Sequence, residues 1–148
     1  MFAGYYANEA ANATAFRDGW FRTGDLGHVD RQGFRYLTGR ASDMYISGGS
    51  NIYPIEIEEK LLTHPAIAEV KVIGVPDDVW GEIGVAACVL RPGTVLSEAD
   101  LLVAMEGKIA KYKMPRRVVF LDALPRSAYG KITKALVREA LVARGMPA

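Results

Sequence analysis

The apolar positions of the chain are densest in two runs, residues 67–75 and 84–90. Both runs are short, and their residues alternate with polar ones or are continuously apolar, which is typical of buried strands. Pro76, Asp77 and Asp78 lie between them and have turn chemistry. The pattern therefore predicts two strands joined by a turn.

Helix signals flank these strands. Pro54 suits the first turn of a helix over residues 55–64, because its missing N–H has no partner at that position. Ser97 can cap a second helix near residues 98–110, since acidic residues follow it directly. Another apolar stretch, residues 117–121, predicts a further strand.

The N-terminal third has hairpin character. Residues 26–38 alternate around a turn at residues 30–33, which predicts a β-hairpin. Two shorter strands are expected at residues 44–46 and 51–53, with a glycine loop between them. Strands and helices thus interleave, which indicates an α+β fold.

Near the C-terminus, the segment PRSAYGKITK places Lys131 in a short turn that opens a terminal helix. Gly130 permits the turn, and Ile132, Leu136 and Ala140 give the helix an apolar face. The segment is no phosphate-binding P-loop, because Pro stands where that motif needs Gly and Ile132 where it needs Ser or Thr. In isolation such a lysine is more often a solvated residue at a helix N-terminus.

Asp25, at the mouth of the predicted hairpin, is a second candidate for a ligand-binding residue, after Lys131. A carboxylate there can accept hydrogen bonds from a vicinal diol such as a ribose. The same residue can also serve as a turn or cap residue. Asp25 by itself leaves both interpretations open.

Three longer segments follow one another: WFRTGDLG from residue 20, GRASDMYISGGSNIYPIEIE from residue 39 and LPRSAYGKITK from residue 124. They resemble, in order and separation, three signature motifs of the adenylate-forming (ANL) superfamily, which contains acyl-CoA synthetases, peptide synthetase adenylation domains and beetle luciferases. The chain resembles the C-terminal domain of an acyl-CoA synthetase, or fatty-acid–CoA ligase, of this superfamily. The implied fold is a small α+β C-terminal lid domain with a mixed three-stranded sheet, a preceding β-hairpin and about three helices.

The resemblance implies a role for individual residues. Lys131 is implied to be the catalytic lysine that bridges the attacking carboxylate and the α-phosphate of ATP. Asp25 and Arg40 are implied to bind the nucleotide. The hinge of the mobile lid is expected at Ser42 and Asp43, although the family usually has Asp or Lys where Ser42 stands.

The glycine loop and the basic C-terminal third are implied to bind CoA. The residues expected to do so are Ser47, Gly48, Gly49, Trp80, Tyr112, Arg116 and Arg117. A Ser-Gly-Gly loop, and a chain that ends without a carrier domain, favour a CoA ligase over a peptide synthetase.

The implied domain organisation is incomplete. Residues 1–40 are expected to be the tail end of the N-terminal adenylating domain, and residues 41–148 the mobile lid. ATP and Mg²⁺ are expected to be held mainly by the missing N-terminal domain, which is the expected partner of the lid together with CoA and a carboxylic acid. The acid is expected to be fatty or aromatic. The fragment alone is expected to be inactive.

Charge supports a polyanion-binding surface, since residues 101–148 hold ten basic and three acidic residues, a net charge of +7. A small basic module that binds nucleic acid or protein is the alternative. Nucleic acid is not favoured, because the chain lacks an aromatic RNA-binding strand, a Gly-x-x-Gly clamp and a helix-turn-helix pattern.

The remaining features indicate no further chemistry. Cys88 lies in an apolar run and is expected in the core. His28 and His64 have no partner at metal-ligand spacing, so no metal site is expected. No stretch reaches membrane-spanning length and no secretory pattern is present, which favours a cytoplasmic protein.

Overall fold

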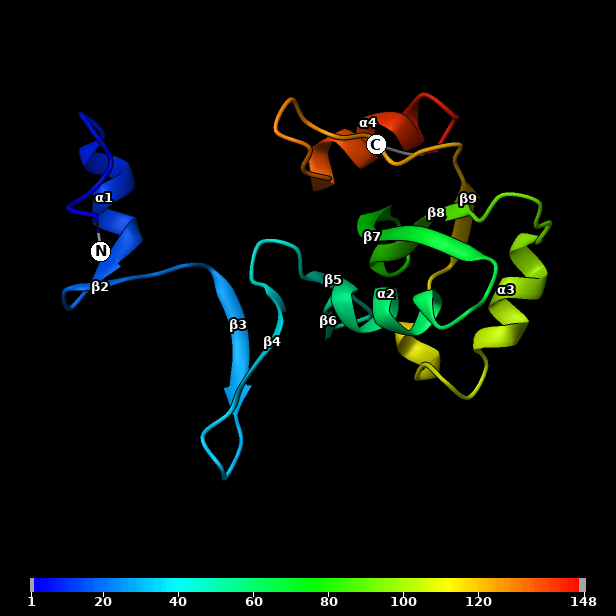
Figure 1. Ribbon diagram of the computed structural model, residues 1–148, viewed down its shortest axis with the longest axis horizontal. Coiled ribbons are helices and arrows are strands. Elements are labelled where there is room, and N and C mark those ends of the chain that lie inside the picture. The colour runs from blue at the N-terminus through cyan, green and yellow to red at the C-terminus, as the bar shows by residue number, and fades with distance from the viewer. Residues whose placement is uncertain (1, 147–148) are drawn as a thin grey trace. The chain divides into compact units, whose positions relative to one another are not determined.

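The chain divides into two compact units, Met1–Ser42 and Asp43–Ala148, of which the computed structural model describes residues 2–146. Each unit is described by itself (Figure 1). The first contains a short helix and two antiparallel pairs of strands: α1 (Glu9–Ala15), β1 (Phe16–Arg17), β2 (Trp20–Phe21), β3 (Asp25–Val29) and β4 (Arg35–Arg40). The β3–β4 pair confirms the hairpin predicted over residues 26–38.

The second unit is built on one sheet. Its strands are β5 (Tyr45–Ser47), β6 (Ser50–Ile52), β7 (Ile67–Asp77), β8 (Gly81–Leu90) and β9 (Arg117–Phe120). The order is β6-β5-β8-β7, and β9 also pairs with β8. Because β9 is parallel to β8 and the other pairs are antiparallel, the predicted mixed sheet is confirmed. It has five strands where three were expected, since Ser47 pairs with Gly81 and joins the β5–β6 hairpin to the sheet.

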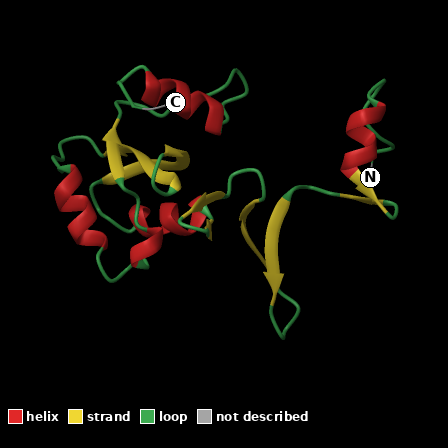
Figure 2. Cartoon of the chain, turned by 180° about the vertical axis from the view of Figure 1, so that it is seen from behind, coloured by secondary structure: helices red, strands yellow, loops and turns green. Residues whose placement is uncertain are grey.

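Helices cover both faces of this sheet (Figures 1 and 2). On one face, α2 (Pro54–Leu62) and α3 (Glu98–Met105) contribute buried Ile57, Leu61, Leu101 and Met105 to a core. On the other face, α4 (Lys134–Val142) contributes Val137 and Leu141.

The two cores explain why β8 is apolar at consecutive positions. Ala86 and Cys88 point into the first core, and Val85 and Ala87 point into the second. A strand with both faces buried has no polar face, and its sequence is therefore a continuous apolar run. This is the physical basis of the signal that located the strand.

Helix boundaries match the cap signals in part. Ser97 accepts a hydrogen bond from the Asp100 amide, as predicted, at 3.1 Å. The helix that follows ends at Met105 instead of near residue 110, because Gly107 adopts a φ of 74° that an α-helix does not use. The terminal helix begins at Lys134, where Thr133 caps it, and not directly at Lys131.

The buried face of the terminal helix also differs from the prediction. Val137 and Leu141 are fully buried, whereas Leu136 and Ala140 are half-buried. The sequence pattern placed the apolar face one residue too early because it took Ile132 as the start of the helix. Ile132 does pack against the second core, but from the preceding loop.

Two glycines on neighbouring strands make room for a buried tyrosine. Gly74 and Gly84 are direct partners in the β7–β8 register, and the Tyr45 side chain lies against both. A Cβ atom at Gly84 would lie 2.2 Å from the Tyr45 hydroxyl, and one at Gly74 would lie 2.4 Å from the Tyr45 Cβ. Only glycine fits at either position without displacing the ring.

Cys88 is a core residue, as expected. It is fully buried, and burial raises the pKa of its thiol to about 12. A thiol that stays protonated and inaccessible is a poor nucleophile. Within residues 2–146, no helix combines the length and apolar character needed to cross a bilayer.

Candidate functional site

The loop that carries Lys131 is closed by its own hydrogen bonds. The Ser127 amide donates to the Lys131 carbonyl at 2.8 Å, and the Gly130 amide donates to the Ser127 carbonyl at 2.8 Å. The Lys131 amide donates to the Ser127 hydroxyl at 3.2 Å. Gly130 turns the chain with a φ of 75°. These hydrogen bonds constrain the backbone on both sides of Lys131.

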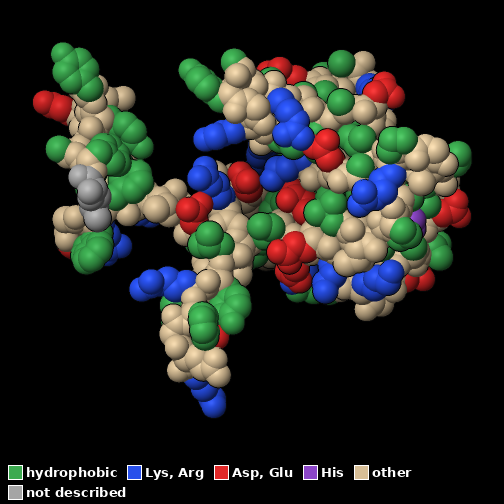
Figure 3. Space-filling model, viewed as in Figure 1, with side chains coloured by type: hydrophobic (Ala, Val, Ile, Leu, Met, Phe, Trp, Pro, Cys, Tyr) green, Lys and Arg blue, Asp and Glu red, His purple; other side chains and the backbone are tan. Residues whose placement is uncertain are grey.

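The side chain of Lys131 is available. The residue is exposed, and no carboxylate of residues 2–146 lies within 4.0 Å of its ammonium. Figure 3 shows Lys and Arg side chains along the segment that precedes α4. A cation without a partner on a rigid loop can attract an anion that is held by another part of a protein.

Asp25 and Arg40 lie together in the first unit. They are direct partners in the β3–β4 register, and the Arg40 Nε lies 2.9 Å from Asp25 Oδ1. The Asp25 side chain is 29% exposed and that of Arg40 is 64% exposed. One carboxylate oxygen of Asp25 is thus engaged, and the carboxylate stays accessible to a hydroxyl donor.

Ser42 and Asp43 stand on the two sides of the boundary between the compact units. Asp43 belongs to the second unit, where its carboxylate lies 3.6 Å from the Lys71 ammonium. Lys71 also lies 3.1 Å from Glu58, on α2. The first residue of the second unit is therefore tied to its strand β7 and helix α2.

The glycine loop is a two-residue hairpin turn between Ser47 and Ser50. Gly48 and Gly49 have φ values of 54° and 78°, which are those of a type I′ turn. The Gly48 amide donates to the Trp80 carbonyl at 2.9 Å. A Cβ atom at Gly48 would lie 2.7 Å from the Trp80 ring. Backbone and indole are thus in direct contact.

Arg116 completes this arrangement. Its guanidinium lies 4.9 Å from the centroid of the Trp80 ring, a cation–π contact. Trp80, Arg116 and Arg117 also line one cavity of about 260 Å³. The structure therefore brings together four of the residues expected to bind CoA: Gly48, Trp80, Arg116 and Arg117.

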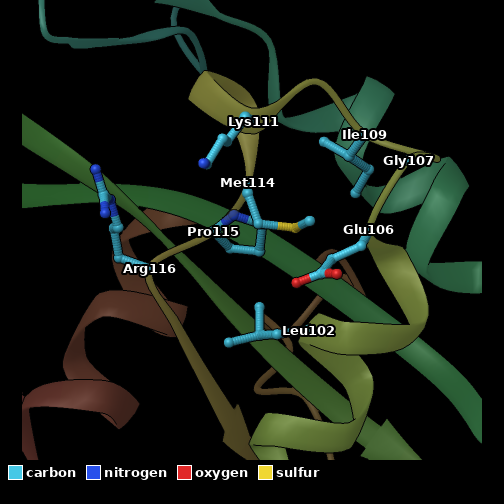
Figure 4. A pocket seen from close by; sticks show the side chains of 8 residues that line it. All are labelled: Leu102, Glu106, Gly107, Ile109, Lys111, Met114, Pro115 and Arg116. Atoms are coloured by element: carbon cyan, nitrogen blue, oxygen red, sulfur yellow. The ribbon is translucent and has the colours of Figure 1, made fainter.

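A second cavity, of about 670 Å³, shares Arg116 (Figure 4). Its lining combines apolar and charged side chains: Leu102, Glu106, Gly107, Ile109, Lys111, Met114, Pro115 and Arg116. Figure 4 shows the nitrogens of Lys111 and Arg116 on one side and the Glu106 carboxylate on the other. Apolar side chains with two cations on one side suit a flat ring that bears phosphate groups on that side, away from the Glu106 carboxylate.

Not every expected CoA residue joins these cavities. Tyr112 is exposed and lines neither of them. Arg117 is engaged by Glu98, with 3.3 Å between Nε and Oε1. Lys113 is bound by Glu56 at 2.7 Å, and this hydrogen bond raises the pKa of the lysine. The basic run is therefore partly neutralised by ion pairs within the domain.

The apolar part of the 670 Å³ cavity was not predicted from the sequence. Leu102, Ile109 and Met114 form it. Its signal was hidden because each of these residues also fits a core position. Within residues 2–146, no three His, Cys, Asp or Glu side chains gather to hold a metal ion.

The glycine loop allows a matched test. Replacing Gly48 with alanine is expected to lower the free energy of unfolding by about 2 kcal/mol, because left-handed strain adds to a clash with Trp80. Gly49→Ala is the control, since nothing lies within 4 Å of its added Cβ and only the strain of about 1 kcal/mol remains. Urea unfolding of both variants measures the difference, and equal losses would show that the Trp80 contact contributes nothing.

Comparison with known proteins assigns the chain to a family. The family model described as "AMP-binding enzyme C-terminal domain" matches residues 56–131, a stretch that ends at Lys131. The chain belongs to this family. The expected resemblance to the C-terminal domain of an adenylate-forming CoA ligase is thereby confirmed, as is its small α+β fold.

The relatives of this AMP-binding enzyme C-terminal domain are enzymes several times longer than this chain. An indoleacetate–CoA ligase of Aromatoleum aromaticum is 51% identical over 140 residues, which are 95% of this chain and 27% of the relative. The crystal structure of ATP-bound MatB from Rhodopseudomonas palustris matches with a TM-score of 0.87 and 41% identity, over 95% of this chain and 28% of MatB.

A third match is the o-succinylbenzoate coenzyme A synthetase MenE of Bacillus subtilis, in complex with ATP and magnesium ion. Its TM-score is 0.84 at 41% identity, over 93% of this chain and 28% of MenE. The chain thus spans slightly more than a quarter of the length of these relatives. Their activities belong to the longer proteins.

Proposed function

We propose that this chain is the mobile C-terminal lid of an AMP-forming acid–CoA ligase, preceded by the tail end of the N-terminal adenylating domain in residues 1–40. The lid itself would comprise residues 41–148. The observation that carries the proposal is the presentation of Lys131, an exposed cation without a partner carboxylate in the described chain, at the end of the family match. Hydrogen bonds within the loop constrain its backbone, so the lysine extends from a defined place on the domain.

The reaction would occur in two steps. In the first, a carboxylate oxygen attacks the α-phosphorus of ATP, an acyl-adenylate forms and pyrophosphate leaves. In the second, the thiol sulfur of CoA attacks the acyl carbon, the thiol proton is lost to solvent and AMP leaves with the bonding electrons. Magnesium would accompany ATP, whose phosphates supply part of its ligands, and both would be held mainly by the larger N-terminal domain.

Lys131 would act in the first step. A carboxylate that approaches a phosphate concentrates negative charge, and an oriented ammonium between the two lowers the energy of that arrangement. Such a cation contributes most when it is fixed before the reaction and shielded from water.

Asp25 and Arg40 would hold the nucleotide. With one oxygen engaged by Arg40, the Asp25 carboxylate can accept hydrogen bonds from the ribose hydroxyls, and the exposed guanidinium can contact the same nucleotide. Ser42 and Asp43 would form the hinge, since the two compact units meet between them. A serine can change φ and ψ at low cost, which suits a hinge residue.

The second step would use the face formed by Gly48, Trp80 and Arg116. Gly48 and Gly49 expose bare backbone next to Ser47, along which a pantetheine arm can pack closely. Because the Gly48 amide donates to the Trp80 carbonyl, the amides of the arm would pair with other backbone groups of this loop. The cavities beside Arg116 offer an apolar floor and cations for the nucleotide end of CoA. Tyr112 and Arg117 remain proposed contributors at its edge.

The lid is not proposed to select the acid. Two relatives act, by their names, on indoleacetate and o-succinylbenzoate, yet they match this chain over the same region. We propose an aromatic or fatty carboxylic acid as substrate and a cytoplasmic location for the enzyme. No observation on the described residues favours the nucleic-acid or protein-binding alternative.

The proposal is tested with the full-length parent protein. With Mg²⁺, ATP and a panel of aromatic and fatty acids, we expect pyrophosphate release that depends on the acid, and acyl-CoA and AMP once CoA is added. The 148-residue chain alone should release none. A full-length, folded protein that releases no pyrophosphate with any acid would exclude the ligase.

The CoA surface is tested by Arg116→Ala in the full-length enzyme. We expect the KM for CoA to rise about tenfold, because a charge-assisted contact to phosphate is worth roughly 1.4 kcal/mol or more. Pyrophosphate release in the first step should stay unchanged. Arg91→Ala is the control, since Arg91 is exposed and lines neither cavity. An unchanged KM for CoA would remove Arg116 from the site.

A further inference from the structure

One arginine ties the Lys131 loop to the central sheet. Arg126 Nη1 donates to the Gly130 carbonyl at 3.3 Å, which is the peptide that joins Gly130 to Lys131. Arg126 Nη2 donates to Glu69 Oε2 on strand β7. The same guanidinium therefore contacts both the peptide next to Lys131 and a side chain of the sheet.

Glu69 is a firm attachment point. It stands beside a register shift in the β7–β8 pairing, between Ile67 and Glu69, and it is paired with Val89. Bulges of this kind redirect a side chain while the strand stays in the sheet. The carboxylate that holds Arg126 thus belongs to a strand that is paired with β8 along most of its length and that contributes to a buried core.

The helix after the loop has its own separate anchor. Arg138 on α4 donates through Nη2 to the Gly74 carbonyl at 2.9 Å, again on β7. The segment from residue 126 to residue 138, which contains the loop and the start of α4, is therefore bound to the same strand at both ends. The bond from Arg126 is the one that reaches the peptide of the proposed catalytic lysine.

From this geometry we infer that Arg126 and Glu69 are positioning residues for Lys131, and the inference rests on the proposed function of that lysine. Arg126 contacts the Gly130 carbonyl and the Glu69 carboxylate at the same time, through two N–H donors in a rigid planar group. A guanidinium has such a fixed pair of donors, whereas the donors of a lysine ammonium share one nitrogen. Displacement of a catalytic group by about 1 Å can cost a factor of about 100 in rate. Loss of the clamp should therefore slow adenylation without affecting the thioester step.

The test compares four variants of the full-length enzyme: Arg126→Met, Arg126→Lys, Glu69→Gln and Arg144→Met. Arg144 is a matched control, because it also donates to a backbone carbonyl, that of Phe120, at 3.0 Å, and lies near the carboxylate of Asp122. Each variant is assayed for acid-dependent pyrophosphate release and for acyl-CoA formation from supplied acyl-adenylate.

We expect Arg126→Met to slow pyrophosphate release by about 10- to 100-fold. Arg126→Lys and Glu69→Gln should slow it about 5- to 20-fold, because each keeps part of the clamp. Acyl-CoA formation should stay within twofold in all four variants, and Arg144→Met should leave both steps unchanged.

Three results would overturn the positioning role. Pyrophosphate release within twofold of wild type in Arg126→Met would do so, as would an equal loss in both steps, or a matching loss in Arg144→Met. Lys131→Met is assayed in parallel. If it loses adenylation while Arg126→Met does not, the positioning role alone fails, and if it keeps adenylation, the function proposed for Lys131 fails and the positioning role with it.

Discussion

Replacement of Lys131 by methionine is expected to slow acyl-adenylate formation in the full-length enzyme by about 10²- to 10³-fold. This is the range observed when one oriented group that stabilises developing charge is removed from an active site. The Lys131 ammonium is exposed, and no carboxylate of residues 2–146 lies within 4.0 Å of it. The substitution therefore breaks no ion pair within the described chain. Acid-dependent pyrophosphate release at saturating ATP measures the effect.

The matched control is Lys134→Met, which removes the same charge three residues further along. Lys134 lies in the first turn of α4 and is half-buried. We expect its loss to change pyrophosphate release by less than threefold, because a general field effect of one surface charge is small at physiological salt. If both variants lose activity equally, net charge and not the position of Lys131 would explain the result.

The largest expected effect on stability is that of Gly84→Ala. Its added Cβ would lie 2.2 Å from the Tyr45 hydroxyl and 3.0 Å from Tyr45 Cζ, in a core without space for the ring to move. We expect the free energy of unfolding to fall by about 3 kcal/mol, at the upper end of the usual cost of overpacking. For a unit of this size, that loss corresponds to roughly 12–20 °C in Tm.

The cause can be isolated with Tyr45→Phe. The Tyr45 hydroxyl is buried and has no hydrogen-bond partner in the described residues, so its removal alone should cost little or stabilise the fold. In the double variant Gly84→Ala/Tyr45→Phe, the Tyr45 hydroxyl that lies nearest to the new Cβ is absent. The loss of free energy of unfolding should therefore be about 1 kcal/mol smaller than the sum of the two single effects. A Gly84→Ala variant as stable as wild type would contradict the tight contact between ring and sheet.

Much of this fold could be predicted from local patterns. The strands β7 and β8 were visible because both of their faces are buried, and the cap at Ser97 was visible because capping depends on neighbouring residues. The end of α3 at Met105 was missed, since the pattern of apolar residues continues through Ile109 while the backbone turns at Gly107.

The site was harder to predict than the fold. The resemblance singled out Gly48, Trp80 and Arg116 one by one. Their mutual contacts depend on the β5–β6 turn, the β7–β8 turn and the segment before β9 meeting in space. The basic run was visible as charge. That Glu56 binds Lys113 and Glu98 binds Arg117 is a consequence of tertiary packing, and it decides which cations remain available.

The central claim is that Lys131 acts in the formation of the acyl-adenylate and not in the transfer of the acyl group from the adenylate to CoA. Supplying preformed acyl-adenylate and CoA to the full-length Lys131→Met enzyme tests this claim most directly, because the first step is bypassed. The account predicts that acyl-CoA then forms within about twofold of the wild-type rate, while pyrophosphate release from ATP stays at least about 100-fold slower. An equal loss in both reactions would contradict it.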